Sequence, residues 1–88
     1  MANHASALKR AKQNEKRRVR NRATRTRVRS AIKSVRQALE TKDAQAAQTA
    51  LQQALPLIGQ AAGQGVLHKK NASRKISRLA RQVRSLGA

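Results

Sequence analysis

The apolar residues of this chain are small and few, and this limits the fold more than any other feature of the sequence. The 88 residues include no Phe, Tyr, Trp or Cys, and 17 of the 34 apolar residues are Ala. Strands are enriched in β-branched and aromatic residues, whereas Ala, Leu, Arg, Lys and Gln favour helices. Surface dominates volume at this length, so there is room for one small core. We therefore expect a single all-helical domain over residues 1–88, with a thin core.

The sequence contains few groups that could carry out catalysis. The absence of Cys excludes a disulfide framework, a thiolate zinc site and a Cys nucleophile. The remaining titratable candidates, which are scattered, are Glu15, Glu40, Asp43, His4 and His68. Catalysis needs such groups in apposition, so we expect no enzyme, no cofactor and no metal site. We expect Glu15 to form an intrahelical ion pair, Glu40 and Asp43 to cap helices at a turn, and His68 either to contact phosphate or to cap the third helix.

Positive charge dominates the sequence but is unevenly distributed. There are 21 Lys and Arg against 3 Asp and Glu, which gives a net charge of +18. Residues 1–36 carry +12, residues 37–68 carry −1 and residues 69–88 carry +7. A surface that only keeps a protein in solution would mix both signs throughout. Two cationic segments around a neutral middle indicate a polyanionic partner.

Neither a membrane span nor a targeting segment is expected. No apolar stretch approaches the roughly 18 residues that a membrane-spanning helix needs. An Arg-rich start could indicate an organelle transit peptide, but the basic character returns at the far end of the chain. We therefore treat the N-terminal residues as part of the mature protein.

The first predicted helix covers about residues 6–40, a stretch without Pro or Gly. An apolar stripe about 120° wide marks its second half, which is typical of a helix that packs on neighbours. This stripe consists of Val28, Ala31, Ile32, Val35, Ala38 and Leu39. The first half carries Lys and Arg in nearly every direction. A helix that is polar all round is seldom stable alone, so we predict that residues 1–25 are frayed in the free protein and become ordered on a bound anion.

The second predicted helix covers about residues 44–63, with Asp43 as its N-cap. Its apolar residues occupy nearly half of the circumference, so we expect two neighbours to bury it. They are Ala47, Ala50, Leu51, Ala54, Leu55, Leu57, Ile58, Ala61 and Ala62. Pro56 is expected to kink this helix without ending it.

The third predicted helix covers about residues 68–86 and follows the turn Gly63-Gln64-Gly65. Its Lys and Arg lie opposite an apolar face formed by Ala72, Ile76, Leu79, Ala80, Val83 and Leu86. Three helices joined by short turns predict an antiparallel bundle. The fold class is therefore all-α, an antiparallel three-helix bundle whose long basic first helix protrudes beyond its partners.

The basic helices are suited to phosphate. Arg presents a planar fork that fits two phosphate oxygens, and Lys presents a point charge. Without aromatic side chains to stack on splayed bases, the chain is not typical of a single-strand reader, so we expect a folded, double-stranded RNA or DNA target.

Two alternatives remain open. The first is a DNA-architectural, histone-like protein, although neither an apolar wedge nor a strong dimer seam is evident. The second is a cationic amphipathic membrane binder, although the third helix lacks Trp and Phe anchors. Competition between duplex DNA and structured RNA separates the first from an RNA binder, and vesicle binding that persists at high salt would support the second.

Several short motifs occur in an order that is typical of a known family. They are Met1-Ala2-Asn3, Ser6-Ala7-Leu8-Lys9-Arg10, Lys12-Gln13-Asn14-Glu15-Lys16-Arg17-Arg18, Arg20-Asn21, Ala31-Ile32-Lys33, Leu67-His68-Lys69 and Ser77-Arg78-Leu79. Each is a weak basic motif alone. Together with the Ala-rich middle that contains Pro56, their order and spacing resemble the bacterial small-subunit ribosomal protein S-twenty family over nearly the whole chain.

The resemblance implies a structural ribosomal protein of the cytoplasm that binds 16S ribosomal RNA directly, at the 5′ domain and the long penultimate stem, and stabilises the folding of the small subunit. The implied RNA-facing residues of the first helix are Asn3, Ser6, Lys9, Arg10, Lys12, Asn14, Lys16, Arg17, Arg18, Arg20, Asn21, Arg22 and Arg25, and those of the third are His68, Lys69, Arg74 and Arg78. The chain departs from the family pattern at His4, Ala5, Lys70 and Asn71. No homo-oligomer is expected.

Overall fold

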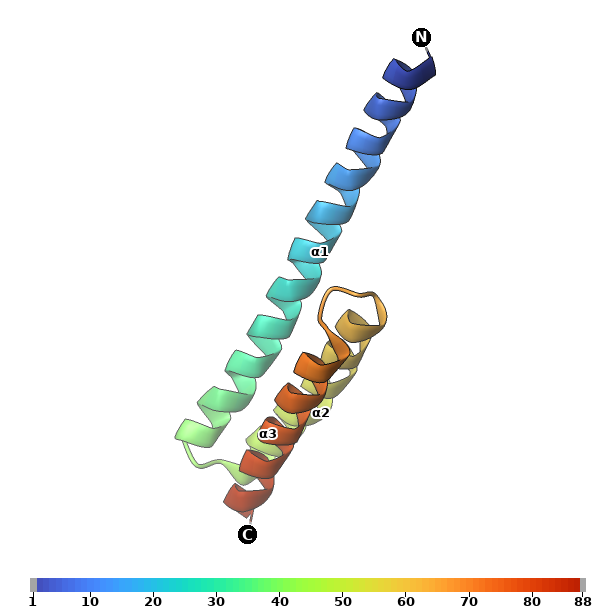
Figure 1. Ribbon diagram of the computed structural model, residues 1–88. Helices are drawn as coiled ribbons and strands as arrows, with labels where there is room; N and C mark the ends of the chain where they lie inside the picture. The colour runs from blue at the N-terminus through green and yellow to red at the C-terminus, as the bar shows by residue number, and fades with distance from the viewer. Residues whose placement is uncertain (1, 88) are drawn as a thin grey trace.

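Three helices form the computed structural model, which describes the backbone of residues 2–87 and the side chains of residues 5–87. The helices are α1 (Ala2–Glu40), α2 (Ala44–Gly63) and α3 (Lys69–Gly87), and these described residues contain no strand. Consecutive helices run antiparallel (Figure 1). The prediction of an all-α, antiparallel three-helix bundle is confirmed. α1 begins at Ala2, earlier than the predicted start near residue 6.

The N-terminal half of α1 protrudes beyond α2 and α3 (Figure 1), as predicted. The molecule measures 66 × 21 × 14 Å along its principal axes. The 39 residues of α1 account for most of this length, because an α-helix rises about 1.5 Å per residue. Every side chain from residue 5 to residue 20 is exposed, and Val28 is the first that is buried. We call residues 5–20 the arm.

One hydrophobic cluster holds the three helices together. Its buried members are Val28, Val35 and Ala38 of α1, Ala47, Leu51, Ala54, Ile58 and Ala61 of α2, and Ala72, Leu79 and Val83 of α3. α2 packs against both other helices, as predicted, whereas α1 and α3 hardly touch each other. The prediction that Leu57 is buried with the other apolar residues of α2 is wrong. Leu57 is only partly buried and lies outside this cluster.

The turn after α1 fixes the antiparallel arrangement of α1 and α2. Lys42 adopts a left-handed backbone conformation with φ of 57°. The amides of Lys42 and Asp43 donate hydrogen bonds to the carbonyls of Leu39 and Ala38, each at 3.1 Å. This is the Schellman pattern that closes many helix C-termini. Asp43 then caps α2 as predicted, since its Oδ1 accepts a hydrogen bond from the amide of Ala46 at 3.1 Å.

The prediction that Glu40 also acts as a cap is wrong for this structure. Glu40 is the last residue of α1, and its carboxylate makes no hydrogen bond to a described residue. The hydroxyl of Thr41 closes this end instead, because it donates to the carbonyl of Ala38 at 3.0 Å. A carboxylate gains nothing from the electronegative end of a helix, whereas a hydroxyl can donate to a free carbonyl.

The turn after α2 uses the same C-terminal pattern. Gly65 has φ of 77°, and the amides of Gly65 and Val66 donate to the carbonyls of Ala62 and Ala61 at 3.1 and 2.9 Å. Val66 then packs against the core. α2 continues through Pro56, so the prediction that Pro56 does not end the helix is confirmed.

Candidate nucleic-acid interface

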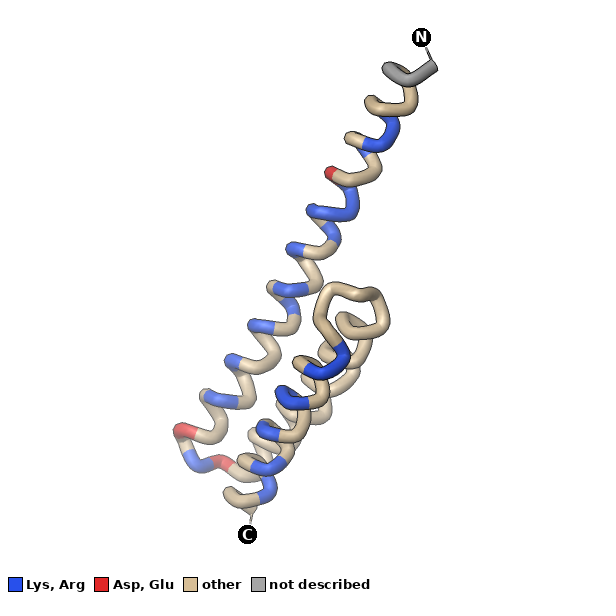
Figure 2. The backbone as a smooth tube through the Cα atoms, viewed as in Figure 1, with Lys and Arg blue, Asp and Glu red and all other residues tan. Residues whose placement is uncertain are grey.

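The positive side chains lie on two of the three helices and on the surface. All 21 Lys and Arg fall within the described residues, and every one is exposed. All but Lys42, which lies in the turn between α1 and α2, follow α1 and α3, whereas α2 carries no charged residue (Figure 2). Among the described residues only Arg18 forms a salt bridge, with Glu15. The other cations therefore have no acidic partner within this part of the protein and can neutralise an external polyanion.

Glu15 is a structural ion-pair residue, as predicted. Its Oε1 accepts a hydrogen bond of 2.7 Å from Nη2 of Arg18, one turn further along α1. That hydrogen bond and the charge of Arg18, with a weaker contribution from Arg22, lower the pKa of Glu15 below its ordinary value. The carboxylate therefore stays ionised near neutral pH, and it aligns a neighbouring Arg on the arm.

The side of the arm that continues the core-facing stripe of α1 is polar. Arg10, Asn14, Arg17, Asn21 and Thr24 precede the buried Val28 at intervals of three or four residues, so they share its side of the helix. Within the bundle this side packs on α2, at Asn21 and Thr24 it is partly buried, and along the arm its side chains are exposed. The sequence therefore replaces the apolar stripe by Arg and Asn at the point where the neighbouring helix ends.

The RNA-facing residues that the resemblance implied surround the arm and do not form one face of it. Nine of them are exposed on the arm, and Arg22 and Arg25 are exposed just beyond it. The nine are Ser6, Lys9, Arg10, Lys12, Asn14, Lys16, Arg17, Arg18 and Arg20. Asn21 is partly buried where α1 meets the other helices. The side chain of Asn3 lies outside the described residues.

A notch forms where the arm leaves the bundle. Arg17, Arg20 and Asn21 of α1 line it together with Gln64 from the turn between α2 and α3. Its volume is about 400 Å³. Two guanidinium groups and two amides make a donor-rich set that suits phosphate and ribose oxygens. No sequence signal indicates Gln64, because only the packing of α2 against α1 brings that turn to the arm.

The implied residues at the start of α3 and along it are all exposed. They are His68, Lys69, Arg74 and Arg78. His68 is the N-cap of α3, since its Nδ1 accepts a hydrogen bond of 3.2 Å from the amide of Lys70. The sequence allows His68 either to cap this helix or to contact phosphate, and the structure shows the capping role. An imidazole that accepts through Nδ1 carries its proton on Nε2, which can donate to an oxygen outside the protein.

The structure also places cations outside the implied set around a second pocket, between α1 and α3. Arg29 and Arg36 of α1 and Lys75 of α3 line this pocket, together with apolar residues. Helical periodicity locates these cations on exposed faces, but only the tertiary structure shows that they face one space.

The described residues hold neither a membrane-spanning helix nor a cluster of metal ligands. Within residues 2–87, none of the helices has the length and apolar character needed to cross a bilayer. His, Asp and Glu side chains form no cluster of three or more in the described part of the chain that could hold a metal ion. The exposed cations of α1 and α3 therefore remain the main chemical feature of the surface.

Comparison with known proteins agrees with this surface. The profile of the family described as ribosomal protein S20 matches residues 2–84. The small ribosomal subunit protein bS20 of Trichlorobacter lovleyi is 54% identical over 87 residues, which cover 99% of this chain and 100% of that protein. The protein of the same name from Syntrophus aciditrophicus is 57% identical over 83 residues, 94% of this chain and 93% of the relative. This chain belongs to the ribosomal protein S20 family.

Proposed function

We propose that this protein is a structural component of the small ribosomal subunit, within ribosomes of the cytoplasm, and that it binds 16S ribosomal RNA directly through its whole length. Membership of the family supports a place in the small subunit. The observation that carries direct RNA binding is the set of exposed cations along α1 and α3, of which only Arg18 has an acidic partner among the described residues.

The proposed mechanism is electrostatic and involves no turnover. Lys and Arg side chains neutralise phosphates and release the counterions that RNA holds, so binding weakens as salt is added. The cations of the arm and those of α3 lie at different positions along a molecule 66 Å long. They can therefore contact separate RNA segments at once, and we assign these segments to the 5′ domain and the long penultimate stem.

The uncharged surface of α2 limits the proposed RNA interface to α1 and α3. α2 has no Lys, Arg, Asp or Glu, and its exposed residues include Gln45, Gln48, Gln52 and Gln53. RNA that follows the cations lies against α1 and α3, with α2 turned away from the phosphates (Figure 2). The protein then acts as a wedge with two basic sides, and it fixes the distance between the RNA segments that it separates.

The experiment measures binding to a transcript of the 5′ domain of 16S ribosomal RNA across a salt series. Arg17→Ala and Arg20→Ala each weaken binding and lower the slope of log affinity against log salt by up to about one unit. Sequence preference does not change, because phosphate contacts do not read bases. Gln53→Ala on α2 is the matched control and leaves both quantities unchanged.

Two results would contradict the proposal. Unchanged salt slopes in both Arg variants would show that these side chains do not contact phosphate. Equal competition by duplex DNA would favour a DNA-architectural function instead.

A further inference from the structure

A groove with an apolar floor runs between α1 and α3, because these helices pack on α2 and hardly on each other. Its volume is about 560 Å³. Val28 and Ile32 of α1 and Leu67 from the segment before α3 form the floor. Val28 is buried, but Ile32 and Leu67 are only partly buried although they pack against the core. A ligand in the groove would remove this remaining apolar surface from water, which is favourable.

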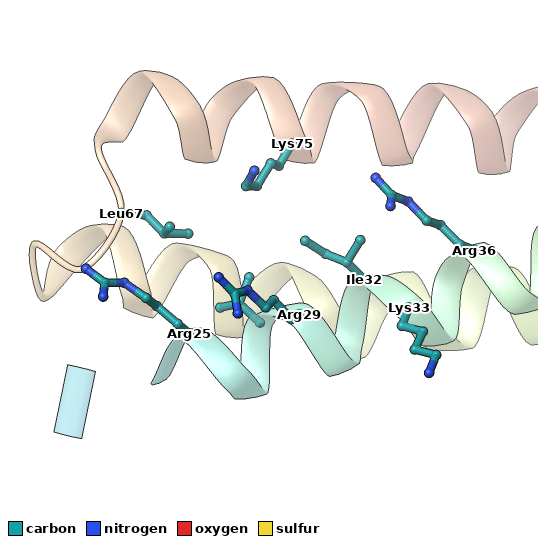
Figure 3. Close-up of a pocket in the computed structure, with 8 residues that line it drawn as sticks. Arg25, Arg29, Ile32, Lys33, Arg36, Leu67 and Lys75 are labelled. Atoms are coloured by element: carbon teal, nitrogen blue, oxygen red, sulfur yellow. The ribbon is translucent and has the colours of Figure 1, made fainter. Parts of the chain in front are cut away.

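Cations line both sides of this floor. Arg36 of α1 and Lys75 of α3 point into the space between the two helices (Figure 3), and Arg29 of α1 also lines it. Lys33 is a lining residue as well, but its amino group points away (Figure 3). All of these side chains are exposed, and none of them has an acidic partner among the described residues. The groove therefore combines an apolar seat with positive charge from two helices, which suits a ligand with one flat apolar part and flanking anionic groups.

The volume of the groove limits the ligand to about the size of a small molecule or one nucleotide. Sites for small molecules and cofactors have volumes of about 300–1,000 Å³, and this groove falls within that range. A single nucleotide fits such a space, but a duplex does not. The chain has no aromatic residue on which a base could stack, but the planar guanidinium groups of Arg also stack on bases.

We propose that this groove seats one unpaired nucleotide of the bound RNA. Its base or ribose packs on Val28, Ile32 and Leu67, and the phosphates on either side of it contact Arg29, Arg36 and Lys75. This inference rests on the proposed RNA binding. It adds a contact that includes apolar surface, whereas the arm presents only charge and hydrogen-bond donors to RNA.

The first test removes the rim charges. The variant with Arg29→Gln, Arg36→Gln and Lys75→Gln is compared with one that removes three other exposed charges of the same helices, Arg27→Gln, Arg81→Gln and Arg84→Gln. Chemical probing of base reactivity is done on full-length 16S ribosomal RNA at saturating protein. The wild type and the control protect one unpaired nucleotide that the rim variant leaves reactive. Both variants lower the salt slope by up to about three units, because each loses three cations.

The second test changes the floor without changing the charge. Ile32→Ala removes apolar contact area, so it weakens binding about three- to tenfold. It leaves the salt slope unchanged and exposes the same nucleotide. Leu67→Ala is a second floor variant from a different segment, and circular dichroism of each free variant verifies that the helices form.

The outcomes separate this inference from the proposed function. If the wild type binds 16S ribosomal RNA and Arg17→Ala weakens binding, but the rim and control variants give the same base reactivities, the groove holds no nucleotide and only this inference fails. If the wild type does not bind 16S ribosomal RNA, the proposed function fails. If the rim variant and the floor variants all fail to protect the same nucleotide, the inference is supported.

Discussion

At the scale of single residues, Lys42 is the position where the backbone and the side chain conflict. It occupies the left-handed site of a Schellman motif with φ of 57°, and a Cβ is unfavourable there. Lys42→Gly removes this strain but adds freedom to the unfolded chain, so we expect a net gain of roughly 0.5–1 kcal/mol in the free energy of unfolding. Urea denaturation followed by circular dichroism measures it. Gly65→Ala, at the corresponding site with φ of 77°, destabilises the protein, and stabilisation by that change would refute the argument.

Glu40 and Asp43, the two acidic residues at the turn between α1 and α2, differ in their roles. Asp43 accepts a hydrogen bond from the amide of Ala46, whereas Glu40 makes none to a described residue. Asp43→Ala therefore lowers the free energy of unfolding by about 1 kcal/mol. Glu40→Ala, measured in the same denaturation series, changes it much less. Equal losses from the two variants would show that the charge of this turn matters more than the cap.

At the scale of elements, α1 consists of a packed half and a half without tertiary support. The side chains of residues 5–20 are all exposed, and an isolated helix with one dominant sign of charge repels itself. We predict that amides of residues 5–20 exchange rapidly in the free protein and slowly once RNA is bound. Amides of α2 between Ala47 and Ala61 are the internal reference. Slow exchange of the arm without RNA would contradict the prediction that it becomes ordered on binding.

Much of the element structure could be predicted from the sequence because the relevant signals are local. The apolar spacing of Val28, Val35 and Ala38 identifies a packed helix half, and Asp43 before an Ala-rich run identifies a helix start. The left-handed Lys42 could not be predicted, because Lys carries no preference for that conformation. The expected cap role of Glu40 rests on its position alone and is wrong, because the free groups at the C-terminal end of a helix are carbonyls, which a carboxylate cannot satisfy.

At the scale of the whole molecule, the excess of positive charge destabilises the folded protein but favours binding to RNA. The net charge of +18 destabilises the compact state through self-repulsion, which salt screens. We therefore predict that the midpoint of thermal unfolding of the free protein rises as sodium chloride increases from low to moderate concentration. The affinity for RNA falls over the same range. A thermal midpoint that falls with salt would show that attractive ion pairs dominate the fold.

The candidate interface could be predicted only in part. The arm residues follow from charge and from the family resemblance, since they lie on one continuous helix. Gln64 in the notch and Lys75 across from Arg29 could not be found from the sequence. Their positions depend on how α2 separates α1 from α3, which is set by packing between elements. Long-range geometry of this kind leaves no periodic signal in the chain.

Recognition of 16S ribosomal RNA is tested most directly by a comparison of two RNAs. The affinity of the purified protein for the 5′ domain of 16S ribosomal RNA is measured against that for an unrelated folded RNA of equal length, across a salt series, with circular dichroism on the same samples. We expect a large preference for the 5′ domain that persists at moderate salt, and a gain in helicity on binding. Equal affinities that fall together with salt, with no gain in helicity, would contradict it.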